Sequence, residues 1–350
     1  MTTRFVALDL VVREEFCNLS CDYCLTGQGN YHRAAAKSGM PLPSLLEAIA
    51  RQGKMMDIPV VKISGGEYLL LDNAVEGLHC LAEKFETVVV MTNGLPLTSG
   101  MLKRLNEIPN LVLQLSLDST TFESNRYRIN NPRLHALFLD RLQLLCRSAI
   151  PFEVYLIINR NSIQTIGKTL DDIKAYGGAP VFPFPVRGPD REGYLPEPSQ
   201  LKALRDLAEN AEGGSLLPHK SYLSMLLEFC ERGHRVERCH IPHIAFTAFD
   251  DGIVSSCPNI WFDEVANILE DGGAGTARKL EQSPLRRGLL RFSASTGLCR
   301  SCFTPWDIIN LYVDGRIPAE ELTKSRLFKG PRTLRKLEAI RNSVRESRYV

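Results

Sequence analysis

Six short apolar runs, each followed by a segment with helical spacing, place the strongest constraint on how this chain can fold. Runs of this length with few charges are typical of strands that are buried on both faces of a parallel sheet. Six such repeats predict right-handed crossovers, and they are too few for a closed eight-stranded barrel. We therefore expect an α/β protein built on an open partial barrel of six βα units. The predicted strands cover residues 5–12, 60–64, 87–92, 111–117, 152–159 and 179–184.

Three cysteines, Cys17, Cys21 and Cys24, follow the first predicted strand with the spacing C-x3-C-x2-C. Thiolates this close in sequence must lie on one loop, where their sulfur atoms can converge on a single point. Cysteine thiolates bind iron–sulfur clusters and zinc, and structural zinc usually takes four ligands in two pairs. Three ligands with no fourth nearby favour a four-iron cluster with one open iron. The alternatives are three unrelated buried cysteines and a partial zinc site.

The composition is that of a soluble enzyme without strong charge bias. The chain has 350 residues, with 42 Lys and Arg against 40 Asp and Glu, a net charge of +2. This balance does not indicate a nucleic-acid-binding protein. We find no signal peptide and no apolar run that could span a bilayer. Ten cysteines without a secretion signal indicate metal or redox chemistry in a reducing cytoplasm.

A second motif, Gly65-Gly66-Glu67, follows the second predicted strand and should lie beside the cysteine loop, because the carboxyl ends of parallel strands share one edge. Together with Tyr23 before the last cysteine, the two motifs resemble those of the radical SAM superfamily. The resemblance covers about residues 5–190. It implies a partial (βα)6 TIM-like barrel, a 4Fe-4S cluster whose open iron binds S-adenosyl-L-methionine (SAM), and a Glu67 that binds the SAM amino group.

Further polar residues end the later strands, at positions where the resemblance implies contacts with SAM. Asn93 ends the third strand within a Thr-Asn-Gly triplet. Ser116 and Asp118 end the fourth strand, where relatives place polar side chains near the ribose and methionine. Arg128 follows, where relatives carry an arginine near the SAM carboxylate, and Asn159 ends the fifth strand near the expected adenosine contact.

Four cysteines lie beyond the barrel and form a second candidate metal site. Cys239 precedes a predicted hairpin, Cys257 ends it in a Gly252-x4-Cys257 pattern, and Cys299 and Cys302 form a C-x2-C pair. Four thiolates can bind zinc or an iron–sulfur cluster, and their spacing does not separate the two. The pattern resembles the SPASM/twitch extension of radical SAM enzymes, which implies a second, fully ligated 4Fe-4S auxiliary cluster of the shorter twitch type.

These features divide the chain into four predicted parts. Residues 1–190 form the radical SAM partial barrel, and residues 191–235 form a helical connection. Residues 236–318 form the twitch-like domain that carries the auxiliary cluster, and residues 319–350 form a basic C-terminal helix.

The resemblance implies an enzyme in which a 5′-deoxyadenosyl radical abstracts a hydrogen atom from its substrate. We expect a small natural-product substrate, a sugar or aminocyclitol, and a reductant such as flavodoxin or ferredoxin. The reaction is a dehydrogenation by an oxidoreductase or an epimerisation by an isomerase, for which Cys230 could donate the returning hydrogen. The alternatives are a SPASM-type maturase of ribosomally made peptides and a non-catalytic iron–sulfur or zinc protein.

Overall fold

The computed structural model describes residues 4–12, 17–24, 42–188, 191–210, 216–291 and 297–348. Its core is one sheet, in which six parallel strands lie side by side in chain order. This confirms the predicted α/β fold with an open, parallel-dominated sheet. The six strands are β1 (Ala7–Val12), β2 (Val60–Gly65), β3 (Thr87–Thr92), β4 (Leu111–Leu117), β5 (Phe152–Ile158) and β6 (Val181–Pro185).

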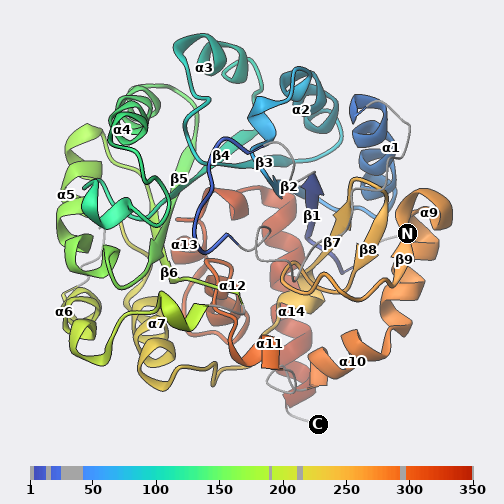
Figure 1. Ribbon diagram of the computed structural model, residues 1–350. Helices are drawn as coiled ribbons and strands as arrows, with labels where there is room; N and C mark the ends of the chain where they lie inside the picture. Colours follow the sequence, from blue (N-terminus) through green and yellow to red (C-terminus); the bar gives the residue numbers. More distant parts are fainter. Residues whose placement is uncertain are drawn as a thin grey trace.

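Helices connect these strands and cover the outer side of the curved sheet (Figure 1). Each buries an apolar stripe, as α4 does with Phe138, Leu142 and Leu145. The helices of this layer are α1 (Leu42–Met55), α2 (Ala74–Ala82), α3 (Ser99–Leu105), α4 (Pro132–Cys146) and α5 (Ile166–Tyr176). Side chains cap two of them: Thr98 accepts a hydrogen bond from a first-turn amide of α3, and Asn131 accepts two from α4. Short 3₁₀ turns lie between them at η1 (Tyr68–Leu70), η2 (Glu123–Asn125) and η3 (Ser162–Thr165).

The predicted hairpin exists, and it continues the same sheet beyond β1. Strand β7 (Ala245–Phe249) pairs in parallel with β1, in the register Ala7 to Ala245, and turns into the antiparallel β8 (Ile253–Ser255). The short β9 (Ala266–Asn267) ends the sheet. The sheet order among the described residues is therefore β6-β5-β4-β3-β2-β1-β7-β8-β9. The sequence pattern predicts the hairpin but not its partner, because strand order depends on contacts far apart in the chain.

The remaining described elements are helical. Five of them lie between β6 and the hairpin, and the rest follow the hairpin. They are η4 (Arg191–Gly193), η5 (Pro198–Leu201), α6 (Lys202–Glu209), α7 (Lys220–Arg232), α8 (Ile241–Ile244), α9 (Ile268–Gln282), α10 (Pro284–Arg291), α11 (Gly297–Arg300), α12 (Asp307–Val313), α13 (Ala319–Leu322), η7 (Arg326–Phe328) and α14 (Pro331–Arg348). The segment predicted as one helix over residues 319–350 is thus divided into α13, η7 and α14, because Gly330 and Pro331 interrupt it.

The C-terminal segment closes the amino-terminal end of the sheet. The Glu153 carboxylate, at the start of β5, accepts hydrogen bonds from Ser325 Oγ at 3.1 Å and from Arg326 N at 2.9 Å. Lys336 of α14 donates to the Phe5 carbonyl just before β1, at 3.1 Å. The opposite end of the sheet, where the strands have their carboxyl ends, is left for a binding site.

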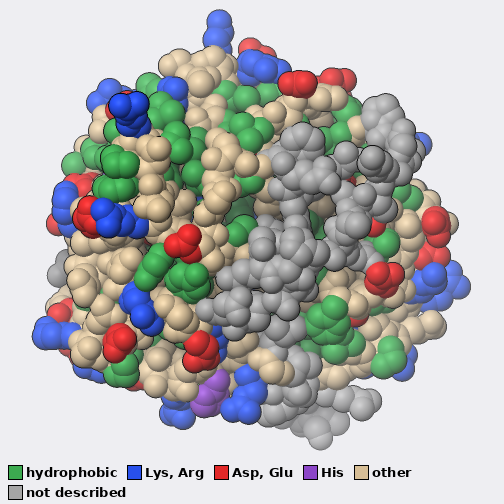
Figure 2. All heavy atoms as spheres, viewed as in Figure 1, with side chains coloured by type: hydrophobic (Ala, Val, Ile, Leu, Met, Phe, Trp, Pro, Cys, Tyr) green, Lys and Arg blue, Asp and Glu red, His purple; other side chains and the backbone are tan. Residues whose placement is uncertain are grey.

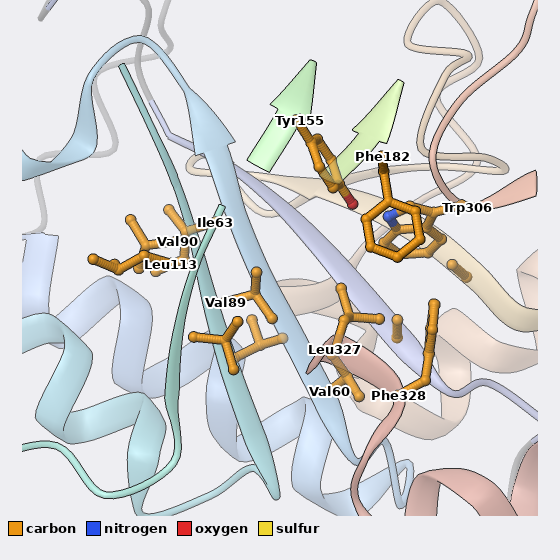
Figure 3. Close-up of a cluster of buried hydrophobic side chains, with 14 of the residues drawn as sticks. Val60, Ile63, Val89, Val90, Leu113, Tyr155, Phe182, Trp306, Leu327 and Phe328 are labelled. Atoms are coloured by element: carbon orange, nitrogen blue, oxygen red, sulfur yellow. The ribbon is translucent and has the colours of Figure 1, made fainter. Parts of the chain in front are cut away.

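Side chains alternate between the two faces of the strands, as the pleat requires. Val90 points to one side of the strands, whereas Leu327, Phe328, Phe182 and Trp306 gather on the other, inside the curve of the sheet (Figure 3). All five are buried. The inner apolar layer supports the floor of the cavity described below.

The periphery of the molecule carries charges of both signs. Lys and Arg side chains are interspersed with Asp and Glu side chains around the face seen in Figure 2. Within the described residues, no helix is both long enough and apolar enough to cross a membrane.

Candidate active site

A cavity of about 210 Å³ opens at the carboxyl ends of the parallel strands, and all three cysteines of the N-terminal motif line it. Backbone hydrogen bonds fix the loop that carries these cysteines. Asp22 N donates to the Tyr127 carbonyl at 2.8 Å, and Cys24 N donates to the Cys21 carbonyl at 3.0 Å. The Cys21 thiol lies 3.7 Å from the Arg128 carbonyl. The sequence therefore folds the three thiols onto one wall of one cavity.

The Gly65-Gly66-Glu67 motif forms the adjacent wall. Gly65 pairs with Val12 at the end of β1 and has φ +131°, a backbone conformation that residues with a Cβ atom rarely adopt. A Cβ at Gly65 would lie 1.9 Å from the Val12 carbonyl oxygen, so only glycine fits there. This close approach brings Glu67 beside the cysteine loop.

The Glu67 carboxylate is buried and accepts three hydrogen bonds. Its Oε1 accepts from Thr92 Oγ1 at 2.9 Å and from Leu69 N at 3.3 Å, and its Oε2 accepts from Asn93 N at 2.7 Å. Burial raises the pKa of Glu67 to about 7, although these hydrogen bonds favour the ionised form. The carboxylate is therefore held in place before a ligand binds. A cation that enters the cavity would favour its ionised form.

Asn93 and Ser116 also line the cavity. Asn93 Nδ2 donates to Asn18 Oδ1 at 2.7 Å, and its own Oδ1 accepts from Leu95 N at 3.0 Å. Asn93 thus ties the end of β3 to the cysteine loop. Ser116 lies on β4 with its side chain on the inner face of the sheet.

Asp118 lies behind the cavity wall and holds three of the other predicted residues together. It accepts hydrogen bonds from Tyr23 Oη, from Arg128 Nε at 2.9 Å and from Asn159 Nδ2 at 2.8 Å. Tyr23 and Arg128 line the cavity, whereas Asp118 and Asn159 are not among the described residues that do. Burial raises the pKa of Asp118, and the Arg128 charge opposes this effect. The predicted contacts of Asp118 and Asn159 with SAM stay predictions, and the structure adds a positioning role for both.

The four C-terminal cysteines come together as well. Cys239, Cys257, Cys299 and Cys302 line a second, smaller pocket, although more than sixty residues separate the first from the last. Burial raises the pKa of Cys239 to about 12 and raises the pKa of Cys257 well above its ordinary value. A bound metal ion or cluster would favour the thiolate form of these side chains. The donor set fits a group bound by four thiolates.

A buried ion pair supports this second pocket. Arg235 binds both carboxylate oxygens of Asp307, at 2.5 and 2.9 Å, and its Nε donates to the Cys302 carbonyl at 2.9 Å. Arg235 N donates to the Arg300 carbonyl at 2.7 Å. Bidentate pairs of this kind fix geometry as well as charge, so Arg235 orients the C-x2-C turn.

Neither pocket is already closed around one ion. In the part of the chain that the structure describes, no group of three or more His, Cys, Asp or Glu side chains is gathered tightly enough to hold a single metal ion. The thiols of each pocket instead border a common space.

Cys230 lies on α7, and its thiol is outside the described lining of the large cavity. Burial raises the pKa of Cys230 to about 12, with the Arg191 guanidinium nearby. The predicted role of Cys230 as hydrogen donor is not tested by this placement alone.

Sequence reasoning missed a group of polar and aromatic residues in the same cavity. Asp9 on β1 and Lys62 on β2 face inward and form a buried ion pair at 3.4 Å. Lys62 Nζ lies 5.6 Å from the centre of the Trp306 ring. The sequence signal that could have identified this pair is a charged residue within each of the two apolar runs. A charge buried in a strand needs a partner on the same face. Arg187 after β6 and Asn259 beyond the hairpin complete this side of the cavity.

Three comparisons with known proteins found matches to this chain. Residues 12–173 match the family model described as the Radical SAM superfamily. A curated relative, the AdoMet-dependent heme synthase of Methanosarcina barkeri, is 24% identical over 176 residues, which are 48% of this chain and 47% of the relative. This chain therefore matches about half the length of that relative.

Solved structures share the fold over most of the chain. Streptococcus suis SuiB bound to S-adenosylmethionine matches with a TM-score of 0.63 and 14% identity, over 85% of this chain and 72% of SuiB. The protein anSMEcpe with bound AdoMet matches with a TM-score of 0.61 and 17% identity, over 96% of this chain and 100% of anSMEcpe. At these identities the similarity establishes the fold, including the segment beyond the barrel.

Proposed function

Because residues 12–173 match the family model of the Radical SAM superfamily, we propose that the chain is a SAM-dependent enzyme that abstracts a hydrogen atom from a small substrate, a sugar or aminocyclitol. The observation that carries this proposal is that three thiols and the Glu67 carboxylate face one cavity. Cys17, Cys21 and Cys24 would hold a four-iron cluster there. When bound, the cluster and SAM supply a 5′-deoxyadenosyl radical.

The residues around the thiols would bind and orient SAM. Glu67 would accept a hydrogen bond from the SAM ammonium, since its carboxylate is held by Thr92 and Asn93 beside the cysteine loop. Ser116 on the facing strand would contact the ribose or methionine part. Arg128 would face the SAM carboxylate, and Asp118 would hold its guanidinium in place.

Other residues would exclude water from the reaction. Pro258, Asn259 and Trp261 after the hairpin, together with Pro305 and Trp306 before α12, form the side of the cavity that faces the parallel strands. A reactive intermediate needs such protection from solvent. The segment beyond the barrel therefore supports the proposal by covering the reacting centre with apolar side chains.

We propose that Cys239, Cys257, Cys299 and Cys302 bind a second four-iron cluster. Four thiols that border one pocket support this choice, and structural zinc is the alternative. A fully ligated cluster there would supply an electron acceptor for a two-electron oxidation. We therefore favour dehydrogenation over epimerisation, with a flavodoxin or ferredoxin as reductant.

A ribosomally made peptide is the second candidate substrate. SuiB was solved with its precursor peptide SuiA, and anSMEcpe was solved with the Cp18Cys peptide. Both share the fold of this chain across the segment beyond the barrel, which favours a related placement of the substrate.

The test is anaerobic cleavage of SAM by the iron-reconstituted protein with dithionite. We expect 5′-deoxyadenosine and methionine in equal amounts, and no product from the variant with Cys17, Cys21 and Cys24 changed to Ala. Candidate sugars, aminocyclitols and peptides are then added in turn, and the true substrate class should accelerate the release of 5′-deoxyadenosine. If the wild-type protein retains its clusters but cleaves no SAM, the chain is a non-catalytic iron–sulfur protein and the proposal is wrong.

A further inference from the structure

The cavity contains three basic side chains, and two of them have an acidic partner. Lys62 pairs with Asp9 at 3.4 Å, and Arg128 pairs with Asp118 at 2.9 Å. The third is Arg187, which follows β6 at the carboxyl end of the sheet. Among the residues that the structure describes, no carboxylate forms an ion pair with Arg187.

The contacts of Arg187 leave most of its guanidinium available. Its Nη1 donates to the amide oxygen of Asn259, a neutral acceptor. Its guanidinium carbon lies 5.8 Å from the centre of the Phe184 ring. Arginine has five N–H donors in a planar fork, which suits two parallel hydrogen bonds to a carboxylate or phosphate. The cation–π contact with Phe184 and the hydrogen bond to Asn259 orient that fork.

Arg187 also stands at a defined place between the two sites. Asn259, its hydrogen-bond partner, lines both the large cavity and the pocket of the four C-terminal cysteines. The positive charge of Arg187 acts on Asp9 on one side and on Cys302 on the other. An anion bound by Arg187 would therefore lie at the end of the cavity nearest the second pocket.

The walls near Arg187 suit a compact ring. Trp261 and Trp306 line the cavity, and Tyr155 stacks edge-on against Phe184 with ring centres 5.8 Å apart. Small-molecule sites usually have mostly apolar walls with a few placed polar or charged groups that fix the orientation of the ligand.

We propose that Arg187 binds an anionic group of the substrate, a carboxylate or a phosphate, at the end of the cavity beside Asn259. This rests on the proposed function, and it narrows the substrate class to an acidic or phosphorylated sugar rather than a cationic aminocyclitol. The Asp9–Lys62 pair lies on the same inner face and offers polar contacts to the ring hydroxyl groups.

The test uses three matched probes on the anaerobic protein loaded with clusters and SAM. Isothermal titration calorimetry compares glucose, glucuronate and glucose 6-phosphate, which share a ring and differ in charge. Wild type should bind at least one of the two anions more tightly than glucose, and the better anion identifies carboxylate or phosphate. Arg187→Gln should bind that anion about tenfold to a hundredfold more weakly, as expected for the loss of a hydrogen bond to a charged group.

Two further variants make the result specific. Arg187→Lys, which keeps the charge, should retain part of the anion preference. Arg126→Gln is the matched control, because Arg126 is exposed and pairs with Glu123 outside the cavity lining. It should leave the anion affinity unchanged.

The proposal is overturned if wild type shows no preference for either anion, or if the preference survives in Arg187→Gln. Unchanged anion binding with a shifted midpoint potential of the second cluster would also overturn it, and would assign the Arg187 charge to that cluster. A wild-type protein that releases 5′-deoxyadenosine but lacks the anion preference refutes this inference alone. Failure to release 5′-deoxyadenosine refutes the proposed function itself.

Discussion

At the scale of single residues, the Glu67 carboxylate is subject to two opposing effects. Burial disfavours its charge, whereas Thr92, Asn93 and the Leu69 amide stabilise it by hydrogen bonds. The site is thus built before any ligand arrives, and the ionised carboxylate is available at neutral pH only in part. A bound ammonium would shift that balance toward the charged form.

Removing this carboxylate should weaken SAM binding. We expect Glu67→Gln, which keeps the shape and one oxygen, to lower the affinity for SAM about tenfold to a hundredfold. Equilibrium dialysis of SAM against the cluster-loaded variant measures this loss. Glu83→Gln is the control, since Glu83 is exposed and pairs with Lys84 on the outer surface. Equal SAM affinity in the Glu67 variant and wild type would exclude Glu67 from the binding site.

A substitution at Gly65 would test the close approach of β1 and β2. Gly65→Ala should destabilise the fold by on the order of 3 kcal/mol, because it combines an unfavourable φ with a clash against the Val12 carbonyl. Gly167→Ala is the matched control. It lies in α5 with no atom within 4 Å of the added Cβ, so the change should be neutral or stabilise by about 0.5 kcal/mol. Urea unfolding measures both, and a Gly65 variant as stable as wild type would contradict the geometry.

Single residues also show where prediction from sequence ends. The placement of Glu67 and the three N-terminal cysteines around one cavity was predictable, because their spacing and the strand ends are visible in the sequence. Asp9 and Lys62 were visible only as charges within apolar runs, and their pairing depends on the register of β1 with β2. Asp118 was predicted to face SAM, but its partners come from elsewhere: Tyr23 from the cysteine loop and Asn159 from the end of β5.

At the scale of elements, α14 depends on a residue far away in sequence. The Glu86 carboxylate accepts hydrogen bonds from Arg332 N at 2.8 Å and from Thr333 N at 2.9 Å, at the first turn of the helix. An acidic side chain there satisfies unpaired amides and complements the helix dipole. Gly330 allows this approach, since a Cβ there would lie 2.1 Å from Glu86 Oε2.

Loss of this cap should loosen α14 and the end of the sheet that it covers. We expect Glu86→Ala to lower the free energy of unfolding by about 1–2 kcal/mol. Amide hydrogen exchange should increase first in residues 331–340, before the strands are affected. Glu83→Ala, three residues away on the surface, should behave like wild type. Unchanged exchange in α14 after the Glu86 substitution would show that the cap is dispensable.

Elements also differ in how well their sequences predict them. The bounds of β3 and β4 agree with the prediction, because each is an apolar run between turn residues. Helix α9 was not predicted, since Gly272, Gly273 and Gly275 interrupt its apolar spacing. Gly272 has φ +64°, and the helix is kinked there. Tertiary packing against α1, where Gly273 N donates to Gln52 at 2.8 Å, overrides the weak local signal.

At the scale of the whole molecule, two groups of cysteines border pockets that share Asn259 as a common wall residue. The C-terminal group is assembled by the pairing of β7 with β1 and by the Arg235–Asp307 ion pair. Neither contact can be read from local spacing. The sequence could therefore indicate four possible ligands, but it could not show that they share one pocket.

Metal analysis of the whole protein tests both groups at once. The anaerobically reconstituted chain should bind about eight irons, as two cubanes held by thiolates. Changing Cys17, Cys21 and Cys24 to Ala should leave about four irons with the spectrum of a fully ligated cluster. Changing the four C-terminal cysteines should leave the other half. Zinc in place of that half would contradict the proposed auxiliary cluster.

The last prediction concerns how the whole molecule disposes of the substrate radical. An epimerase must return a hydrogen from the face opposite to its abstraction, whereas a dehydrogenase needs only an electron acceptor nearby. Cys230 is outside the described cavity lining, and Asn259 places the C-terminal thiol pocket directly beside the cavity. We therefore expect a product with two hydrogens fewer than the substrate, formed in deuterated water without deuterium uptake, and unchanged in kind by Cys230→Ala. Mass spectrometry of the product measures both properties. One deuterium at an inverted carbon, lost in the Cys230 variant, would establish epimerisation with Cys230 as the donor.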